Sequence, residues 1–184
     1  MLKLSAKMPF DDLLPLSVGT VTLSDDTPEN MSIIDCPVGT EAKLSEVLKS
    51  AHGMGLPTAN RTTGSAKNRC IWFGKNHLLL GPKPDDVLTK VARLSDVSDG
   101  YAVLRAEGKD IEAVLARLVP LNLAQKHFKR GHTARTLIQH MHGSLTRVSD
   151  SAFQVIVFRS MAQTLVHDLE RAMISVEARA SLLK

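Results

Sequence analysis

The segment GYAVLRAEGKDIEAVLARLVPL, residues 100–121, decides the fold because it joins a strand directly to a helix. Its first part is a short apolar run that ends at Gly108, which predicts a strand. After Gly108, apolar residues recur at helical spacing until Pro120 closes the segment. The residues that would share one helix face are Ile111, Val114, Leu115 and Leu118.

The same order of elements occurs on both sides of this junction. After the helix of residues 109–121, the sequence predicts a basic loop, a strand pair and a terminal helix, at residues 122–131, 132–148 with 152–160, and 161–183. Before it, the sequence predicts strands at 17–23 and 30–38, a helix at 39–53, a basic loop at 56–69, a strand pair at 70–74 with 77–82, and a helix at 83–94.

The repeated order predicts an α+β fold with two duplicated units related by a pseudo-twofold axis. We expect a single globular domain over residues 1–184, made of half-repeats at residues 17–98 and 99–178 that share or swap edge strands. Residues 1–16 are predicted to be a loose N-terminal segment. Few residues are identical between the halves, so the order of elements carries this prediction.

The composition is that of an ordinary globular protein, with 43% hydrophobic and 23% charged residues in 184. No apolar run approaches the ~20 residues that span a bilayer. Charged residues interrupt the first segment, which disfavours a signal peptide, so we expect a cytoplasmic protein without membrane contact. The mild net charge of +4 and the scarcity of aromatic residues disfavour nucleic acid as a partner.

The segment GHTARTLIQHMHGSL, residues 131–145, raises the question of a metal site. On one continuous strand, His140 and His142 would point to the same side with the spacing of zinc ligands. The other histidines fall on separate elements, so a partly exposed strand face is favoured. GMGLP at residues 53–57 lacks the third glycine of a dinucleotide-binding turn. We therefore predict no catalytic, cofactor-binding or metal-ligating residue in this chain.

Basic residues are the candidates for contact with a partner protein. Two basic loops occupy matching places in the two halves, and their candidates are Arg61, Lys67 and Arg69 in the first and Lys126, Lys129 and Arg130 in the second. Solvated loop charge and a docking surface for an acidic partner both fit this pattern. Arg135 and Arg159 flank the second strand pair, where a buried guanidinium would need an acid from this chain or from another subunit.

Five segments occur in order between residues 72 and 169, within a match that covers roughly residues 30 to 170: WFGKNHLLLGP, SDGYAVLRAEG, VLARLVPLNL, GHTARTLIQHM and AFQVIVFRSMAQTLVHDL. Together they resemble the gamma subunit of heterotetrameric sarcosine oxidase. The resemblance implies the fold of the folate-binding part of aminomethyltransferase, the T-protein of glycine cleavage. This implied fold agrees with the duplicated α+β units expected from the order of elements.

The resemblance also implies partners and cofactors. In such a complex the alpha and beta subunits carry FAD, FMN and NAD, and the delta subunit binds zinc. The complex oxidises sarcosine to glycine and passes the one-carbon unit to tetrahydrofolate, or releases it as formaldehyde, with hydrogen peroxide as a further product. The gamma chain would be a non-catalytic structural or assembly subunit without a cofactor of its own, in direct contact with the alpha subunit.

Two other functions stay open. A stand-alone folate-dependent one-carbon-transfer or iron-sulfur-maintenance protein of the same fold would bind folate. Related members place a carboxylate ahead of the strand that ends Ala-Arg, whereas the run from Gly131 to Arg135 has none, which disfavours folate binding. An RNA-binding module that uses the basic loops would bind with an affinity that falls steeply with salt.

Overall fold

The structure is a computed structural model that describes residues 7–65, 68–81 and 83–182. Its first half contains β1 (Leu16–Val18), β2 (Val21–Asp25), β3 (Asn30–Asp35), α1 (Glu41–His52), β4 (Thr62–Ser65), β5 (Asn68–Phe73), β6 (Asn76–Gly81), the 3-10 turn η1 (Asp86–Lys90) and β7 (Arg93–Asp96). Its second half contains β8 (Tyr101–Gly108), α2 (Ile111–Leu115), β9 (Thr133–Ile138), β10 (Met141–Ser149), β11 (Ala152–Phe158), the 3-10 turn η2 (Arg159–Met161) and α3 (Ala162–Leu182).

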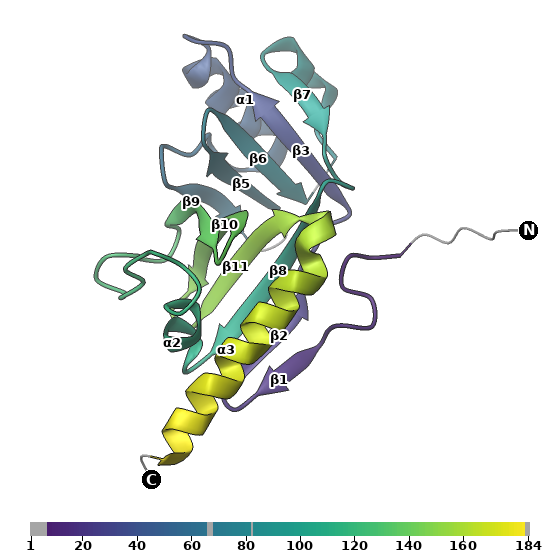
Figure 1. Cartoon of the computed structure of the whole chain (residues 1–184). Helices are drawn as coiled ribbons and strands as arrows, with labels where there is room; N and C mark the ends of the chain where they lie inside the picture. The colour runs from purple at the N-terminus through teal and green to yellow at the C-terminus, as the bar shows by residue number, and fades with distance from the viewer. Residues whose placement is uncertain (1–6, 66–67, 82, 183–184) are drawn as a thin grey trace, which may run out of the picture.

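The strands form two antiparallel sheets, which confirms the predicted α+β class (Figure 1). The N-sheet has the strand order β4-β5-β6-β3-β7, and the C-sheet has the order β1-β2-β8-β11-β10-β9. Four strands follow the same order in both sheets, because β4-β5-β6-β3 corresponds to β9-β10-β11-β8. The two halves therefore share one strand arrangement.

The first two strands belong to the sheet of the other half. β2 pairs antiparallel with β8, with Val21 opposite Gly108 and Asp25 opposite Leu104. Residues from the predicted first half-repeat thus extend the sheet of the second one. In the N-sheet, β7 takes the equivalent place beside β3. Each added strand covers an edge that would otherwise expose unpaired backbone groups.

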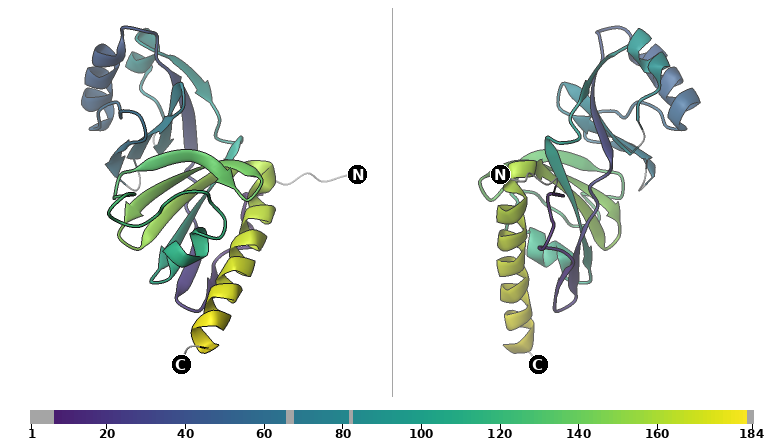
Figure 2. Two further views of the ribbon diagram at one scale, coloured as in Figure 1. Left: turned by 60° about the vertical axis from the view of Figure 1, so that its left-hand side comes forward. Right: turned by 90° about the vertical axis from the view of Figure 1, so that its right-hand side faces the viewer.

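Helices cover the outer faces of the sheets, and the inner faces pack together in the middle (Figure 2). α1 and η1 cover the N-sheet through Leu44, Leu48 and Leu88. α2 and the long α3 cover the C-sheet, and α3 runs diagonally along it (Figure 1). The cluster between the sheets consists of Met31, Ile71, Phe73, Leu78, Leu80, Val103 and Ile156. This burial of apolar side chains on both faces drives the layered fold.

Within residues 7–16, part of the segment predicted to be loose, several apolar side chains pack on the domain. Phe10 is 2% exposed and belongs to the core cluster under α2 and α3. Leu13 and Leu14 pack against the same cluster. The backbone N–H of Leu13 donates to the carbonyl of Phe10 at 3.0 Å, which closes a turn around the anchor. Residues 1–6 lie outside the described part of the chain.

Two predicted helices are shorter than expected. Residues 83–94 form only the turn η1, in which the Asp85 carboxylate accepts a hydrogen bond from the N–H of Val87 at 2.9 Å. The chain then extends as β7, because pairing with β3 satisfies its backbone groups. The helix predicted for residues 109–121 is α2 followed by tight turns, since Pro120 has no N–H with which to continue a helix.

Two predicted strands are hairpins. Residues 17–23 turn at Gly19, whose φ of 57° lies in the left-handed region that glycine adopts freely. Residues 132–148 turn at Gln139 and His140, where Gln139 has a φ of 53°. The expectation of one continuous strand through His140 is therefore wrong. A two-residue turn reverses the chain there and pairs β9 with β10.

Candidate functional site

The layer between the two sheets changes from aromatic to basic along its length. Alternate residues of β5 and of β8 point into this layer. At one end, the rings of Phe73 and Tyr101 meet with their centroids 5.6 Å apart. In the middle, Ile71 and Val103 are buried in the same cluster. The next inward position along each of the two strands is an arginine.

These two arginines, Arg69 and Arg105, line a pocket at the basic end of the layer, and Arg130 joins them from the loop before β9. The arginine pocket, as we call it, has a volume of about 380 Å³, and its other lining residues include Thr62, Ser65 and Val148. Within the described residues, only one of the three guanidiniums has an acidic partner. The Nη2 atom of Arg105 lies 2.7 Å from Oε2 of Glu107.

Arg69 is the most enclosed of the three arginines. It is 7% exposed, and its Nε atom is buried without a hydrogen-bond partner in the part of the chain that the structure describes. Burial is the main cause that lowers the pKa of Arg69; the Asp26 carboxylate opposes this, and the charges of Arg130 and Arg105 add to it. A guanidinium stays charged at physiological pH. The pocket therefore concentrates positive charge around a group that lacks a partner.

The two basic loops meet beside this pocket. The backbone of residues 60–62 joins the residues that lead into β9 through hydrogen bonds of 3.0 and 3.1 Å and an isolated β-bridge. This contact places Arg61 next to the loop that carries Lys129 and Arg130. Lys67, the remaining candidate of the first loop, lies outside the described residues.

Arg135 lies at the aromatic end of the layer. Its guanidinium carbon is 4.0 Å from the centre of the Phe73 ring, and no ion pair joins it to another described residue. Tyr101 stacks on Phe158, with ring centroids 5.3 Å apart. Phe158 is 46% exposed and Leu137 is 41% exposed. Arg135 is thus held by a cation–π contact and lies near exposed apolar surface.

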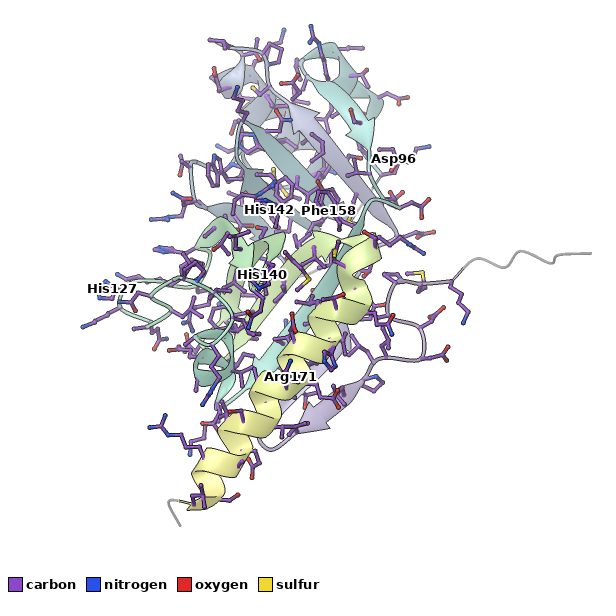
Figure 3. All side chains as sticks on the ribbon, viewed as in Figure 1. Asp96, His127, His140, His142, Phe158 and Arg171 are labelled. Carbon is purple, nitrogen blue, oxygen red and sulfur yellow. The ribbon has the colours of Figure 1, made fainter. Side chains whose placement is uncertain are left out.

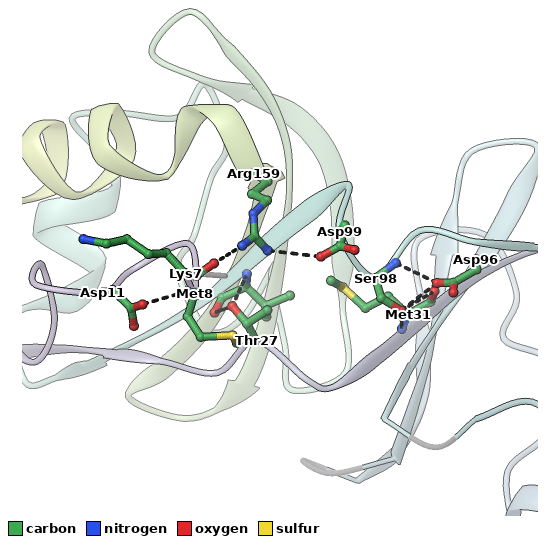
Figure 4. A network of polar contacts seen from close by, with 10 residues as sticks. Lys7, Met8, Asp11, Thr27, Met31, Asp96, Ser98, Asp99 and Arg159 are labelled. Atoms are coloured by element: carbon green, nitrogen blue, oxygen red, sulfur yellow. Dashed lines mark hydrogen bonds and ion pairs between the residues drawn. The ribbon is translucent and has the colours of Figure 1, made fainter. Parts of the chain in front are cut away.

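Arg159 connects the end of β11 to the N-terminal segment (Figure 4). Its Nη1 atom lies 3.5 Å from Oδ1 of Asp99, and its Nη2 atom donates to the carbonyl oxygen of Lys7. The Asp99 side chain is fully exposed, so this ion pair contributes little to stability. Of the two alternatives that the sequence leaves open for Arg159, the structure shows an internal partner.

The most enclosed charged side chain is Arg147, which the sequence analysis did not single out. It is 0% exposed. Its Nη2 atom donates to Oε1 of Glu112 at 2.8 Å. The same Nη2 atom also donates to the backbone carbonyl oxygen of Leu123, while Nε donates to that of Phe128 and Nη1 to that of Asp150. Arg147 thereby ties α2 and the irregular segment after it to β10.

Three histidines of the second half lie on a turn, a strand and a loop. His140 is in the β9–β10 turn, His142 is exposed on β10, and His127 is on a different loop (Figure 3). Among residues 7–65, 68–81 and 83–182, no group of three or more histidine, cysteine or acidic side chains is placed to hold a metal ion. Burial raises the pKa of the Cys70 thiol to about 12, which keeps it protonated at neutral pH. None of the helices described here is long and apolar enough to cross a membrane.

Known structures share this fold. No protein-family model and no curated protein matches the chain. A chain in the structure of heterotetrameric sarcosine oxidase from Corynebacterium sp. U-96, in complex with pyrrole 2-carboxylate, matches 94% of this chain and 96% of its own length, with a TM-score of 0.78 and 20% identity.

Two aspartate kinase structures are much less similar. The enzyme from Clostridium acetobutylicum matches 89% of this chain and 37% of its own, at 12% identity, and the regulatory subunit from Thermus thermophilus matches 85% and 99%, at 15% identity. Both have a TM-score of 0.39, which is too low to bear on the fold. The fold is therefore that of a chain of heterotetrameric sarcosine oxidase, as the sequence resemblance implies.

Proposed function

We propose that this chain is a non-catalytic structural or assembly subunit of a heterotetrameric sarcosine oxidase-like complex, in the gamma position. One observation carries the proposal: the fold corresponds from end to end, over 94% of this chain and 96% of the sarcosine oxidase chain. If the matched chain were one of the larger subunits of that complex, only part of its length would be covered. The ordered sequence segments between residues 30 and 170 support the same position.

In this proposal the chemistry takes place on the partner chains. The alpha, beta and delta subunits hold FAD, FMN, NAD and zinc and bind tetrahydrofolate, and the complex converts sarcosine to glycine with formaldehyde or methylenetetrahydrofolate and hydrogen peroxide as products. This chain supports the alpha subunit. The shared strand order of its two sheets supports a duplicated unit like the folate-binding part of aminomethyltransferase.

We further propose that exposed basic residues contact an acidic surface of the alpha subunit. Arg61 and Lys129 come from the two loops that meet beside the arginine pocket, and Arg135 is exposed at the other end of the layer. Clustered charges of one sign steer association with an oppositely charged partner. Arg159 is a weaker candidate because Asp99 and the Lys7 carbonyl already engage it.

Purification of the tagged chain from its native cells tests the proposal. We expect a yellow complex with three further chains and sarcosine-dependent oxygen uptake. The double variant Arg61→Glu, Lys129→Glu should retain about tenfold less flavin, because like charges then face each other across the interface. Arg171→Glu on α3 is the matched control and should retain flavin fully (Figure 3). A colourless protein without partners would contradict the subunit role, and its binding of tetrahydrofolate and RNA would then be measured.

A further inference from the structure

We propose that the arginine pocket binds a small oxoanion of the phosphate type. This inference goes beyond the subunit role, which requires no ligand in this chain. The pocket lies between the two halves of the molecule, because Arg69 comes from β5, Arg105 from β8 and Arg130 from the loop before β9. The ligand would therefore be held by both halves at once.

The chemistry of the three side chains favours a phosphate group. Each guanidinium is a planar group with several N–H donors, and such forks bind phosphate oxygens with short charge-assisted hydrogen bonds. A tetrahedral oxoanion presents acceptors in several directions and so suits donors that approach from three different elements. A carboxylate has its acceptors in one plane, so it matches donors from three directions less well than a tetrahedral oxoanion does.

Arg69 is the most buried of the three arginines that would bind the anion. It is 7% exposed, and its Nε–H lacks an acceptor among the described residues. Of the nearby acids, Glu107 pairs with Arg105 through the Nε and Nη2 atoms of that arginine, and Asp26 accepts a hydrogen bond from Gln154 at 2.7 Å. A buried donor without an acceptor is unfavourable. An entering oxoanion supplies that acceptor and neutralises part of the positive charge.

The dimensions of the pocket favour a small molecule over a protein surface. A volume of about 380 Å³ holds a phosphate group with a short organic part. Arg69 lines this volume while exposing little of itself, so a partner chain lying across the opening would not reach its Nε atom. Exposed Arg130 would guide the anion inward through its charge.

Binding can be measured on the purified full-length chain, which separates this test from the subunit proposal. Inorganic phosphate and glycerol 3-phosphate are the two probes, with potassium chloride and acetate at equal ionic strength as controls. We expect phosphate to raise the Tm by about 3 °C or more at saturation. We also expect it to shift the NMR resonance of the Arg69 Nε–H group. Comparison of the Kd values of the two probes shows whether the pocket prefers free phosphate or a phosphomonoester.

Three variants locate the effect. Arg130→Gln changes an exposed side chain and should keep the fold, but the Kd for phosphate should rise about tenfold. Arg69→Met should abolish the Tm rise. Arg171→Gln, on α3, should bind phosphate like the unchanged chain. Equal protection by chloride or acetate would overturn the proposal, as would equal losses in Arg130→Gln and Arg171→Gln.

Discussion

Arg147 and Arg69 are both buried, yet their surroundings differ. Arg147 is 0% exposed, donates to Glu112 and to three carbonyl oxygens, and lies 4.4 Å from the centre of the Phe153 ring. Arg69 is 7% exposed and has an Nε atom without a partner in the described chain. Burial alone therefore does not assign a role to a charge. The hydrogen-bond partners indicate the role: those of Arg147 stabilise the fold, whereas the Nε–H of Arg69 is available to a ligand.

The largest expected effect tests the structural role of Arg147. Arg147→Met removes the hydrogen-bond donors to Glu112 and to three backbone carbonyl oxygens, two of them in buried contacts, so the free energy of unfolding should fall by about 3–5 kcal/mol. Urea unfolding followed by circular dichroism measures this change. Arg171→Met, an exposed arginine on α3, is the control and should change the value by less than about 0.5 kcal/mol. A loss for Arg147→Met as small as the control would remove the distinction between the two buried arginines.

A smaller loss is expected when the acid is removed and the arginine stays. In Glu112→Gln, Arg147 keeps its carbonyl acceptors, and the Glu112 side chain is 40% exposed, so solvent screens the pair. The free energy of unfolding should fall by about 1 kcal/mol. In the background of Arg147→Met the same substitution should have almost no effect, which a double-mutant cycle shows directly. If the stability losses of the two single variants add fully in the double variant, the ion pair between Arg147 and Glu112 does not contribute to stability.

The opposite sign is expected at Arg69. In buffer without phosphate, Arg69→Met replaces a partnerless buried charge with an apolar chain of similar length. The free energy of unfolding should therefore rise by about 1 kcal/mol. The same urea titration measures it. A decrease like that of Arg147→Met would show that Arg69 already has a structural partner.

The smallest effect concerns a half-buried base, His77, which, unlike Arg69, can lose its proton near neutral pH. Burial lowers the pKa of His77 from its usual 6.5, and the hydrogen bond to the Pro57 carbonyl opposes this in part. The unfolded chain then binds more protons below about pH 6.5, so the free energy of unfolding should fall as the pH decreases through that region. His77→Gln should flatten this dependence. An unchanged slope in the variant would assign the effect to other groups.

The sequence was sufficient for elements with strong local signals. The helix predicted for residues 161–183 is α3, because its apolar residues keep helical spacing over its length. Gly53 ends α1 with a φ of 69°, as its position after the periodic residues predicts. The strand of residues 100–108 is β8 with one residue fewer. Where local spacing and tertiary packing agree, boundaries are accurate to one or two residues.

Other parts of the fold depend on contacts between distant segments, which local patterns do not contain. η1 and β7 replace a predicted helix because β3 offers an edge for pairing. Phe10 packs into the core although it lies in the segment predicted to be loose. For the site, the sequence indicated the two basic loops but not Arg105, which lies inside a strand. Arg69 and Arg105 continue the alternating inward positions of their strands, so the sequence pattern could have indicated that they point into the layer between the sheets. In the same way, Arg147 lies two residues after buried Leu145, which could have indicated that its side chain is buried.

The placement of β2 beside β8 has a consequence for how the chain folds. The paired residues are roughly 80 positions apart in the sequence, and such long-range contacts raise the contact order of the protein, which slows folding. During synthesis, β1 and β2 emerge long before β8, the strand with which β2 pairs, and until then their apolar residues stay exposed to solvent. The first half of the chain is therefore expected to reach its native state only together with the second, as one kinetic unit. A fragment that ends before residue 100 should be slow to fold and prone to aggregate.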